Sequence, residues 1–156
     1  MSEDLRQFGD PGSAEFRVEA YPFYLLNRAA SRYNVVIESR LRPIGLEIPA
    51  WRVLMILGEQ QPLPIAQVAK SAVINISTMM RIVERMVKAD LITTRPSASD
   101  GRVTELELTA HGQQKLAEAR AATAPVYQAV IRDFSAEDFA RALDLLGRLH
   151  DNLGDL

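Results

Sequence analysis

Apolar residues recur every three or four positions along most of the chain, and this spacing is typical of amphipathic helices. A first long helix is predicted over residues 22–43, because Pro22 suits the first turn of a helix and the apolar spacing follows it. Residues 1–20 combine glycine, proline and acidic residues, so we expect a flexible arm there rather than packed structure. A second helix opens at Pro49 and ends before Pro62.

Two further helices, joined by a tight turn, follow in the middle of the chain. Residues 64–72 are long enough for two helical turns, and a break follows at Val73. The next helix begins after Asn75, whose side-chain oxygen can accept from the free amides of a first turn, and runs to about Asp90. Its predicted apolar stripe comprises Ile76, Met79, Met80, Val83 and Val87. The pattern therefore predicts a helix-turn-helix.

A β-hairpin is predicted directly behind this pair of helices. Leu91–Arg95 and Val103–Leu108 are rich in β-forming residues, and the residues between them favour turns. Two helices close the chain, one capped by Thr109 and bent at Pro125, the other opened by a capping box at Ser135–Asp138. We expect a mainly α fold with a small β-hairpin wing, that is, a winged helix-turn-helix flanked by N- and C-terminal helices.

Composition excludes several classes of protein. The 156 residues contain no cysteine, which excludes disulfides, thiolate metal sites and thiol-based redox sensing. No apolar run approaches the length of a bilayer span, so we expect a cytoplasmic protein without membrane contact. The net charge of −2 hides a basic middle segment. Residues 64–102 hold Lys70, Arg81, Arg85, Lys88, Arg95 and Arg102 against Glu84, Asp90 and Asp100. Such a patch can bind phosphate even in an acidic protein.

The polar side of the second helix in the pair carries the residue types that DNA recognition needs. The residues opposite its predicted apolar stripe are Ser77, Thr78, Arg81, Arg85 and Lys88. A helix that enters the major groove needs such donors for base edges and phosphates, and Arg81 is the best single candidate for base readout. Asn75 completes the set at the helix N-terminus. An isolated basic helix is more often a solvent-exposed surface without a binding role. The surrounding sequence must therefore distinguish a DNA-recognition helix from such a surface.

Five motifs occur in order around this helix. They are Trp51–Leu54 preceded by Gly45-Leu46, Thr78–Met86, Leu91-Ile92 with Arg95-Pro96, Asp100–Arg102, and Leu106–Gly112. Together they resemble the MarR (multiple antibiotic resistance regulator) family, over about residues 22–153, and Asp-x-Arg followed by Leu-Thr-x-x-Gly is the most specific part. One departure is Val73, where the family often has glycine. The resemblance implies a regulator, by family habit a repressor, that binds a pseudo-palindromic operator in double-stranded DNA and is released by a small-molecule effector.

The resemblance also implies roles for single residues. Ser77, Thr78 and Arg81 would face the major groove. Arg102, at the tip of the hairpin, would reach a minor groove or its phosphates, and Asp100 would hold it by charge and hydrogen bonds. Without the resemblance, Asp100 and Arg102 could be an exposed ion pair on a turn, which typically contributes only about 0–1 kcal/mol.

Dimerisation is a further implication of the resemblance. A homodimer would form through helices at about 22–43 and 109–153, around a winged helix-turn-helix at about 47–109, so that residues 21–156 are a single MarR-type domain. The terminal helices carry more apolar surface than they would need to cover the core of a small domain. The residues concerned are Val126, Val130, Phe134, Phe139, Leu143, Leu146 and Leu149. An intramolecular helix pair is the alternative.

By resemblance, a ligand pocket lies between the dimer helices and the DNA-binding lobe. The candidate lining residues are Tyr24, Arg28, Tyr33, Trp51 and Met55. An arginine beside aromatic residues suits a planar carboxylate, because it offers paired charged donors within an apolar wall. The expected ligand is a small aromatic or phenolic molecule. Such residues more often form an ordinary aromatic core cluster beside an arginine whose apolar stem is buried. The sequence leaves both interpretations open.

Two other function classes compete with this interpretation. An enzyme needs an activated nucleophile, a paired acid and base, or a metal site, and none assembles in the sequence. His111 and His150 have no ligands at suitable spacing, so we expect no catalytic residue, no metal and no cofactor. The second alternative is a winged-helix protein-interaction module without specific DNA binding. Arg81, Arg85 and Arg102 argue against it.

Overall fold

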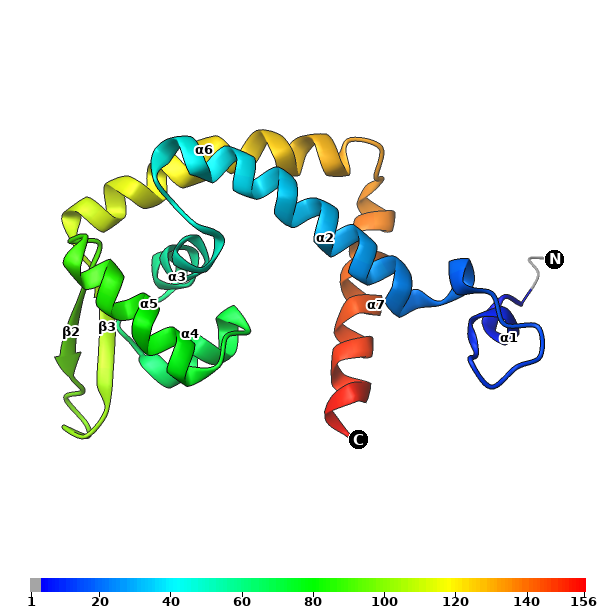
Figure 1. The fold of residues 1–156 in the computed structure, drawn as a ribbon, viewed down its shortest axis with the longest axis horizontal. Coiled ribbons are helices and arrows are strands. Elements are labelled where there is room, and N and C mark those ends of the chain that lie inside the picture. The colour runs from blue at the N-terminus through cyan, green and yellow to red at the C-terminus, as the bar shows by residue number, and fades with distance from the viewer. Residues whose placement is uncertain (1–3) are drawn as a thin grey trace.

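Two long helices run along the molecule and a small lobe lies beneath one end of them. In the computed structural model, which describes residues 4–156, α2 (Pro22–Leu41) packs against α6 (Ala110–Ile131). The helices α3 (Ile48–Glu59), α4 (Ile65–Ala72) and α5 (Ile76–Lys88) and a small sheet form the lobe, and α7 (Ala136–Gly154) leaves the opposite end of α6 (Figure 1). The structure is mainly helical with a hairpin wing, as the sequence predicts.

The first long helix begins at the predicted residue, and its C-terminus lies within two residues of the predicted C-terminus. Pro22 takes the first turn of α2, where its missing N–H costs nothing, and a short 3-10 turn, η2 (Arg42–Ile44), follows Leu41. Only Ile37 and Leu41 of α2 are buried, so the helix joins the core at its C-terminal end alone. Among residues 4–156, no helix is long and apolar enough to cross a membrane.

The centre of the lobe is α3 (Ile48–Glu59), which contacts α2, α4, α5, α6 and the sheet. The helix-turn-helix consists of α4 (Ile65–Ala72) and α5 (Ile76–Lys88), as predicted. The turn between them passes through Val73, whose backbone is left-handed with φ 58° and ψ 46°. This is the position where glycine is common in the family that the sequence resembles, and a β-branched residue is strained there.

The predicted apolar stripe of α5 is wrong in part. The buried residues of α5 are Met79, Ile82, Val83 and Met86, which share one face at i, i+3, i+4 and i+7. The other three predicted members are exposed, namely Ile76 (51%), Met80 (47%) and Val87 (42%). Packing against α3 and α4 sets the rotation of α5, so these three side chains form a flank between its buried and polar faces.

The sheet has one more strand than the sequence predicts. The hairpin strands β2 (Ile92–Pro96) and β3 (Thr104–Leu108) pair antiparallel, with Ile92 opposite Leu108 and Pro96 opposite Thr104. The unexpected strand, β1 (Leu63–Pro64), pairs with the other edge of β3 and gives the order β1-β3-β2. Two residues, one of them a proline, are too short to show the alternating pattern of a strand. This strand can be recognised only from its pairing with β3.

Side-chain caps fix the starts of the last two helices. Thr109 Oγ1 accepts from the amide of Gly112 at 2.9 Å and begins α6, which continues through Pro125. Ser135 and Asp138 form the predicted capping box at the start of α7. No residue of α7 is buried. Val126, predicted to face a second copy, instead lies in the core of its own chain.

The N-terminal segment is more ordered than the sequence suggests. Between residues 4 and 20 it forms a short helix, α1 (Arg6–Gly9), and a 3-10 turn, η1 (Val18–Ala20). Phe8 is buried beneath the guanidinium of Arg17, whose Cζ lies 4.4 Å from the ring centroid. The expectation that this segment lacks packed structure is therefore wrong at Phe8, because a local cation–π contact covers the ring. Residues 1–3 of the predicted arm lie outside the described residues, and the flexibility of the arm stays a prediction.

Candidate DNA interface and ligand pocket

The first turn of α5 is held by its own polar side chains. Asn75 Oδ1 accepts from the backbone amide of Thr78 and from the hydroxyl of Ser77, both at 2.8 Å. Asn75 is therefore the predicted N-cap, and its acceptor is occupied within the chain. Ser77 and Thr78 are both exposed on this turn.

The three basic candidates of α5 are exposed and differ in how far their charge is neutralised. Arg85 forms a loose ion pair with Glu47, with 3.5 Å between Nη1 and Oε2. Arg81 and Lys88 have no ion-pair partner among residues 4–156. Two full positive charges therefore lie on the exposed face of α5 and are available to an anionic partner.

The tip of the wing holds an arginine in a defined orientation. Asp100 accepts from Nε and Nη2 of Arg102, both at 3.1 Å, and from the Arg102 amide at 3.0 Å. The predicted contact between these residues is confirmed. The side-chain and backbone hydrogen bonds from Arg102 lower the pKa of Asp100 below the ordinary aspartate value. Because the pKa is lowered, the contact is complete at neutral pH and is lost as acid protonates the carboxylate.

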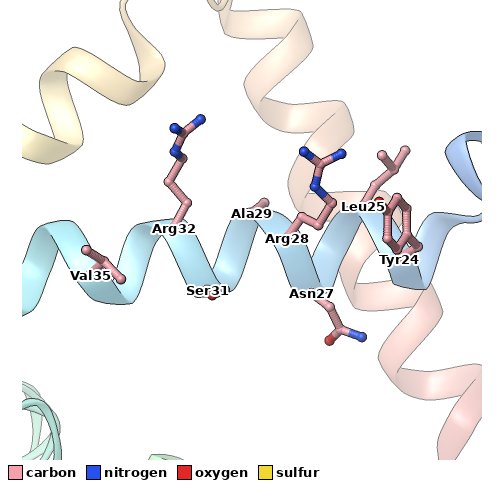
Figure 2. A pocket seen from close by; sticks show the side chains of 8 residues that line it. All are labelled: Tyr24, Leu25, Asn27, Arg28, Ala29, Ser31, Arg32 and Val35. Atoms are coloured by element: carbon pink, nitrogen blue, oxygen red, sulfur yellow. The ribbon is translucent and has the colours of Figure 1, made fainter.

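The five ligand-pocket candidates do not come together in the structure. Tyr24 and Arg28 line a groove of about 730 Å³ on the N-terminal half of α2, where the Arg28 guanidinium lies 5.4 Å from the Tyr24 ring centroid. Figure 2 shows that Arg28 and Arg32 rise from one side of α2 and that Asn27 points to the other side. All the residues that line this groove belong to α2, so one chain leaves it open on the far side.

The other three candidates meet in a second pocket of about 560 Å³. Tyr33 from α2 and Trp51 and Met55 from α3 line it, together with Arg52, Ile56 and the end of α4. Burial raises the pKa of the Tyr33 phenol and the positive charge of Arg52 opposes that shift, so the phenol is neutral and can donate at neutral pH. The indole Nε1 of Trp51 is buried without an acceptor among the described residues.

Arg52 is the pocket residue that the candidate set omits. It is the one charged residue in the apolar stretch 48–58, and that isolation was the available signal. Its Nη1 donates to the carbonyl of Ala72, the last residue of α4, at 3.3 Å. The guanidinium therefore connects the pocket wall with the turn of the helix-turn-helix.

Sequence comparisons agree with this architecture. The model of the MarR family matches residues 46–104. The chain is 36% identical to the HTH-type transcriptional repressor IacR of Pseudomonas putida, over 94% of this chain and 88% of that protein. These similarities are to a transcriptional repressor and not to an enzyme.

Solved structures share the fold over almost the whole chain. A MarR family transcriptional regulator from Silicibacter pomeroyi superposes with a TM-score of 0.82 at 25% identity and covers 96% of this chain and 98% of its own. BpsR of Bordetella bronchiseptica, whose DNA binding is regulated by 6-hydroxynicotinic acid, gives a TM-score of 0.77 at 20% identity, over 87% and 97% of the two chains. With the repressor similarity spanning 94% of its length, this chain belongs to the MarR family of transcriptional regulators.

Proposed function

We propose that the protein is a homodimeric repressor that binds an operator through α5 and the wing and is released by a small aromatic acid bound beside α3. The proposal assigns residues 47–109 to the winged helix-turn-helix and residues 22–43 and 109–153 to dimerisation. The observation that carries it is the unpaired charge of Arg81 on the exposed face of α5, next to a wing whose arginine is already oriented. The relatives named as transcriptional repressors support the same function.

The two arginines have different expected roles. Arg81 lies in the middle of α5 and can present its guanidinium to a guanine, whose O6 and N7 accept in the major groove. Arg102 lies at the tip of the hairpin, where a minor groove and its phosphates would be within reach, and its orientation depends on Asp100. Ser77 and Thr78 would face the major groove with Arg81, while Arg85 and Lys88 would contact phosphates and set the register without reading sequence.

Arg81→Ala should weaken operator binding by about 1–3 kcal/mol and relax the preference at one base pair per half-site. Arg102→Ala should lower affinity for many sequences, most where the minor groove is narrow, because this arginine reads groove shape and phosphate. Fluorescence anisotropy with an operator and a scrambled duplex, at one salt concentration, measures both effects. Arg6→Ala is the matched control, since Arg6 is exposed and belongs to α1, which lies at the opposite end of the molecule from α5 and the wing (Figure 1). Unchanged affinity in folded Arg81→Ala and Arg102→Ala would instead favour the interaction-module alternative.

The pocket beside α3 has the chemistry of an aromatic-acid site. Trp51, Met55 and Ile56 supply an apolar wall, while Arg52 and the Tyr33 phenol supply donors. A carboxylate would form a charge-assisted pair with the guanidinium. BpsR, similar in fold alone, shows that this fold can couple an aromatic acid to DNA binding.

Release follows from the second contact of Arg52. The Arg52 guanidinium donates to the carbonyl of Ala72, immediately before the strained residue Val73. A bound carboxylate competes for that donor and withdraws it from the end of α4. The turn that positions α5 then loses a support, and the two recognition helices leave the spacing that the operator requires.

Aromatic carboxylates should therefore raise the melting temperature of the protein, and their neutral amides should not. Thermal-shift titration with benzoate, phenylacetate, cinnamate and the three amides tests this. Arg52→Met keeps the apolar stem and should weaken carboxylate binding about tenfold or more, because a hydrogen bond to a charged group is lost. Arg28→Met, in the groove on α2, is the matched control and should respond like the unaltered protein. Loss of the response in Arg28→Met but not in Arg52→Met would contradict the proposal, because the ligand would then bind in the groove on α2 and not in the pocket beside α3.

A further inference from the structure

The exposed flank of α5 carries two large apolar side chains next to its best base-reading residue. Ile76 and Met80 lie four residues apart, so they project from neighbouring turns within about 40° of each other around the helix. Both are about half exposed, and Met80 directly precedes Arg81. Neither belongs to the core of the lobe, and neither lines the pocket beside α3. About half of each side chain is therefore uncovered within one chain.

The polar groups of the same turn are largely committed. Asn75 Oδ1 accepts from both Ser77 and Thr78, so the hydroxyl of Ser77 donates inside the chain. The first turns of α5 therefore offer a partner the exposed apolar side chains of Ile76 and Met80 beside the Thr78 hydroxyl and the Arg81 guanidinium. The one apolar group displayed in the major groove is the C5-methyl of thymine.

We propose that Ile76 and Met80 pack against thymine methyl groups and select thymine beside the base pair that Arg81 reads in each half-site. The inference rests on the proposed DNA-binding function and adds the sequence preference of the operator. Four residues of helix rise about 6 Å, and successive base pairs about 3.4 Å, so the two side chains reach methyl groups one or two base-pair steps apart.

The surrounding charge favours DNA over a second protein as the occupant of this flank. Met80 and Arg81 leave α5 about 100° apart, so a partner that extends from Met80 onto the polar face meets the Arg81 guanidinium. Arg81 has no acidic partner among residues 4–156, and burying an unpaired charge against a protein is costly. Arg85 and Lys88 continue the positive face along the same helix. A duplex supplies both the methyl groups and the phosphates that this arrangement needs.

Replacing thymine by deoxyuridine tests the proposal, because it removes the methyl group alone. The unaltered protein first selects its duplex from a randomised library, and each thymine of that duplex is then replaced in turn. We expect one or two positions per half-site at which the replacement weakens binding about fourfold for each methyl removed, the value of burying one methyl group. Met80→Ala should bind the thymine duplex more weakly and become insensitive to deoxyuridine at one position, and Ile76→Ala at the neighbouring one.

Val87→Ala is the matched control, since Val87 lies on the same flank but at the C-terminal end of α5, away from the turns that contact base edges. It should keep the full thymine preference. Circular dichroism confirms that each variant is folded. A selected duplex whose affinity is unchanged by deoxyuridine at every thymine would overturn the inference and leave the DNA-reader function intact. Equal loss on the thymine and deoxyuridine duplexes in both variants would also overturn it. Failure to select any duplex would refute the proposed function itself.

Discussion

Gly112→Ala should lower the free energy of unfolding by about 3 kcal/mol or more, or prevent folding altogether. A Cβ atom on Gly112 would lie 1.9 Å from the carbonyl oxygen of Leu91 and 2.9 Å from its carbonyl carbon. Both atoms are backbone and cannot swing away as a flexible side chain would. The same carbonyl accepts from the amide of Thr109 at 3.1 Å, and Thr109 in turn caps the amide of Gly112. The clash therefore cannot be relieved without breaking the junction between the hairpin and α6.

Gly101→Ala is the matched control for this prediction. Gly101 lies in the turn of the wing, where an added Cβ atom would meet no other atom within 4 Å, and its φ is not positive. Its replacement should change the free energy of unfolding by less than about 0.5 kcal/mol. Urea denaturation followed by circular dichroism gives both values. A Gly112→Ala protein as stable as Gly101→Ala would show that the approach of Leu91 to α6 is looser than the structure has it.

Gly112 also illustrates how far local sequence signals reach. The cap by Thr109 is visible in the sequence because the cap and the amide that it accepts from are three residues apart. The close approach of Leu91 is not visible, because it depends on how the hairpin returns to the start of α6. The start of α2 at Pro22 and the capping box at Ser135 are local in the same sense, and the sequence predicts both.

The errors in the prediction arise where tertiary packing decides. Met80 fits an apolar stripe by spacing, but the rotation of α5 against α3 and α4 leaves it exposed, with Ile82 buried in its place. The strand β1 forms only because β3 is beside it. Sequence spacing alone gives neither the rotation of a helix nor the partner of a two-residue strand.

The candidate sites divide in the same way. Asp100 and Arg102 are two residues apart, so their contact follows from the turn, and the sequence predicts it. The ligand candidates come from two helices whose relative placement is not local. Tyr33 reaches Trp51, whereas Tyr24 lies more than two helical turns earlier on α2 and lines a different groove. Arg52, from the same turn of α3 as Trp51, takes the place that Arg28 had in the prediction.

The apolar face of α7 gives the second large expected effect. No residue of α7 is buried within its own chain, and Leu143 and Leu146 are 58% and 48% exposed, on one side of the helix. The groove on α2 is likewise lined by one helix alone. Exposed apolar area on both terminal helices is what an interface with a second copy would cover. Leu143→Asp combined with Leu146→Asp should therefore convert a dimer into a monomer.

The expected loss is large because each two-fold interface contains both leucines twice. Fully burying a leucine contributes roughly 1.5–3 kcal/mol, and about half of each of these leucines is exposed in a single chain. The four therefore amount to at least about 3 kcal/mol, or about two orders of magnitude in the dimer dissociation constant, and burying the introduced carboxylates adds to this loss. Light scattering measures the mass, and Arg148→Asp, which puts the same charge on the opposite side of α7, should leave it unchanged. The double variant should keep its circular dichroism spectrum, because neither leucine is buried in its own chain. It should also lose specific operator binding, since one recognition helix cannot hold two half-sites. A folded double variant that stays dimeric would show that α7 does not form the interface.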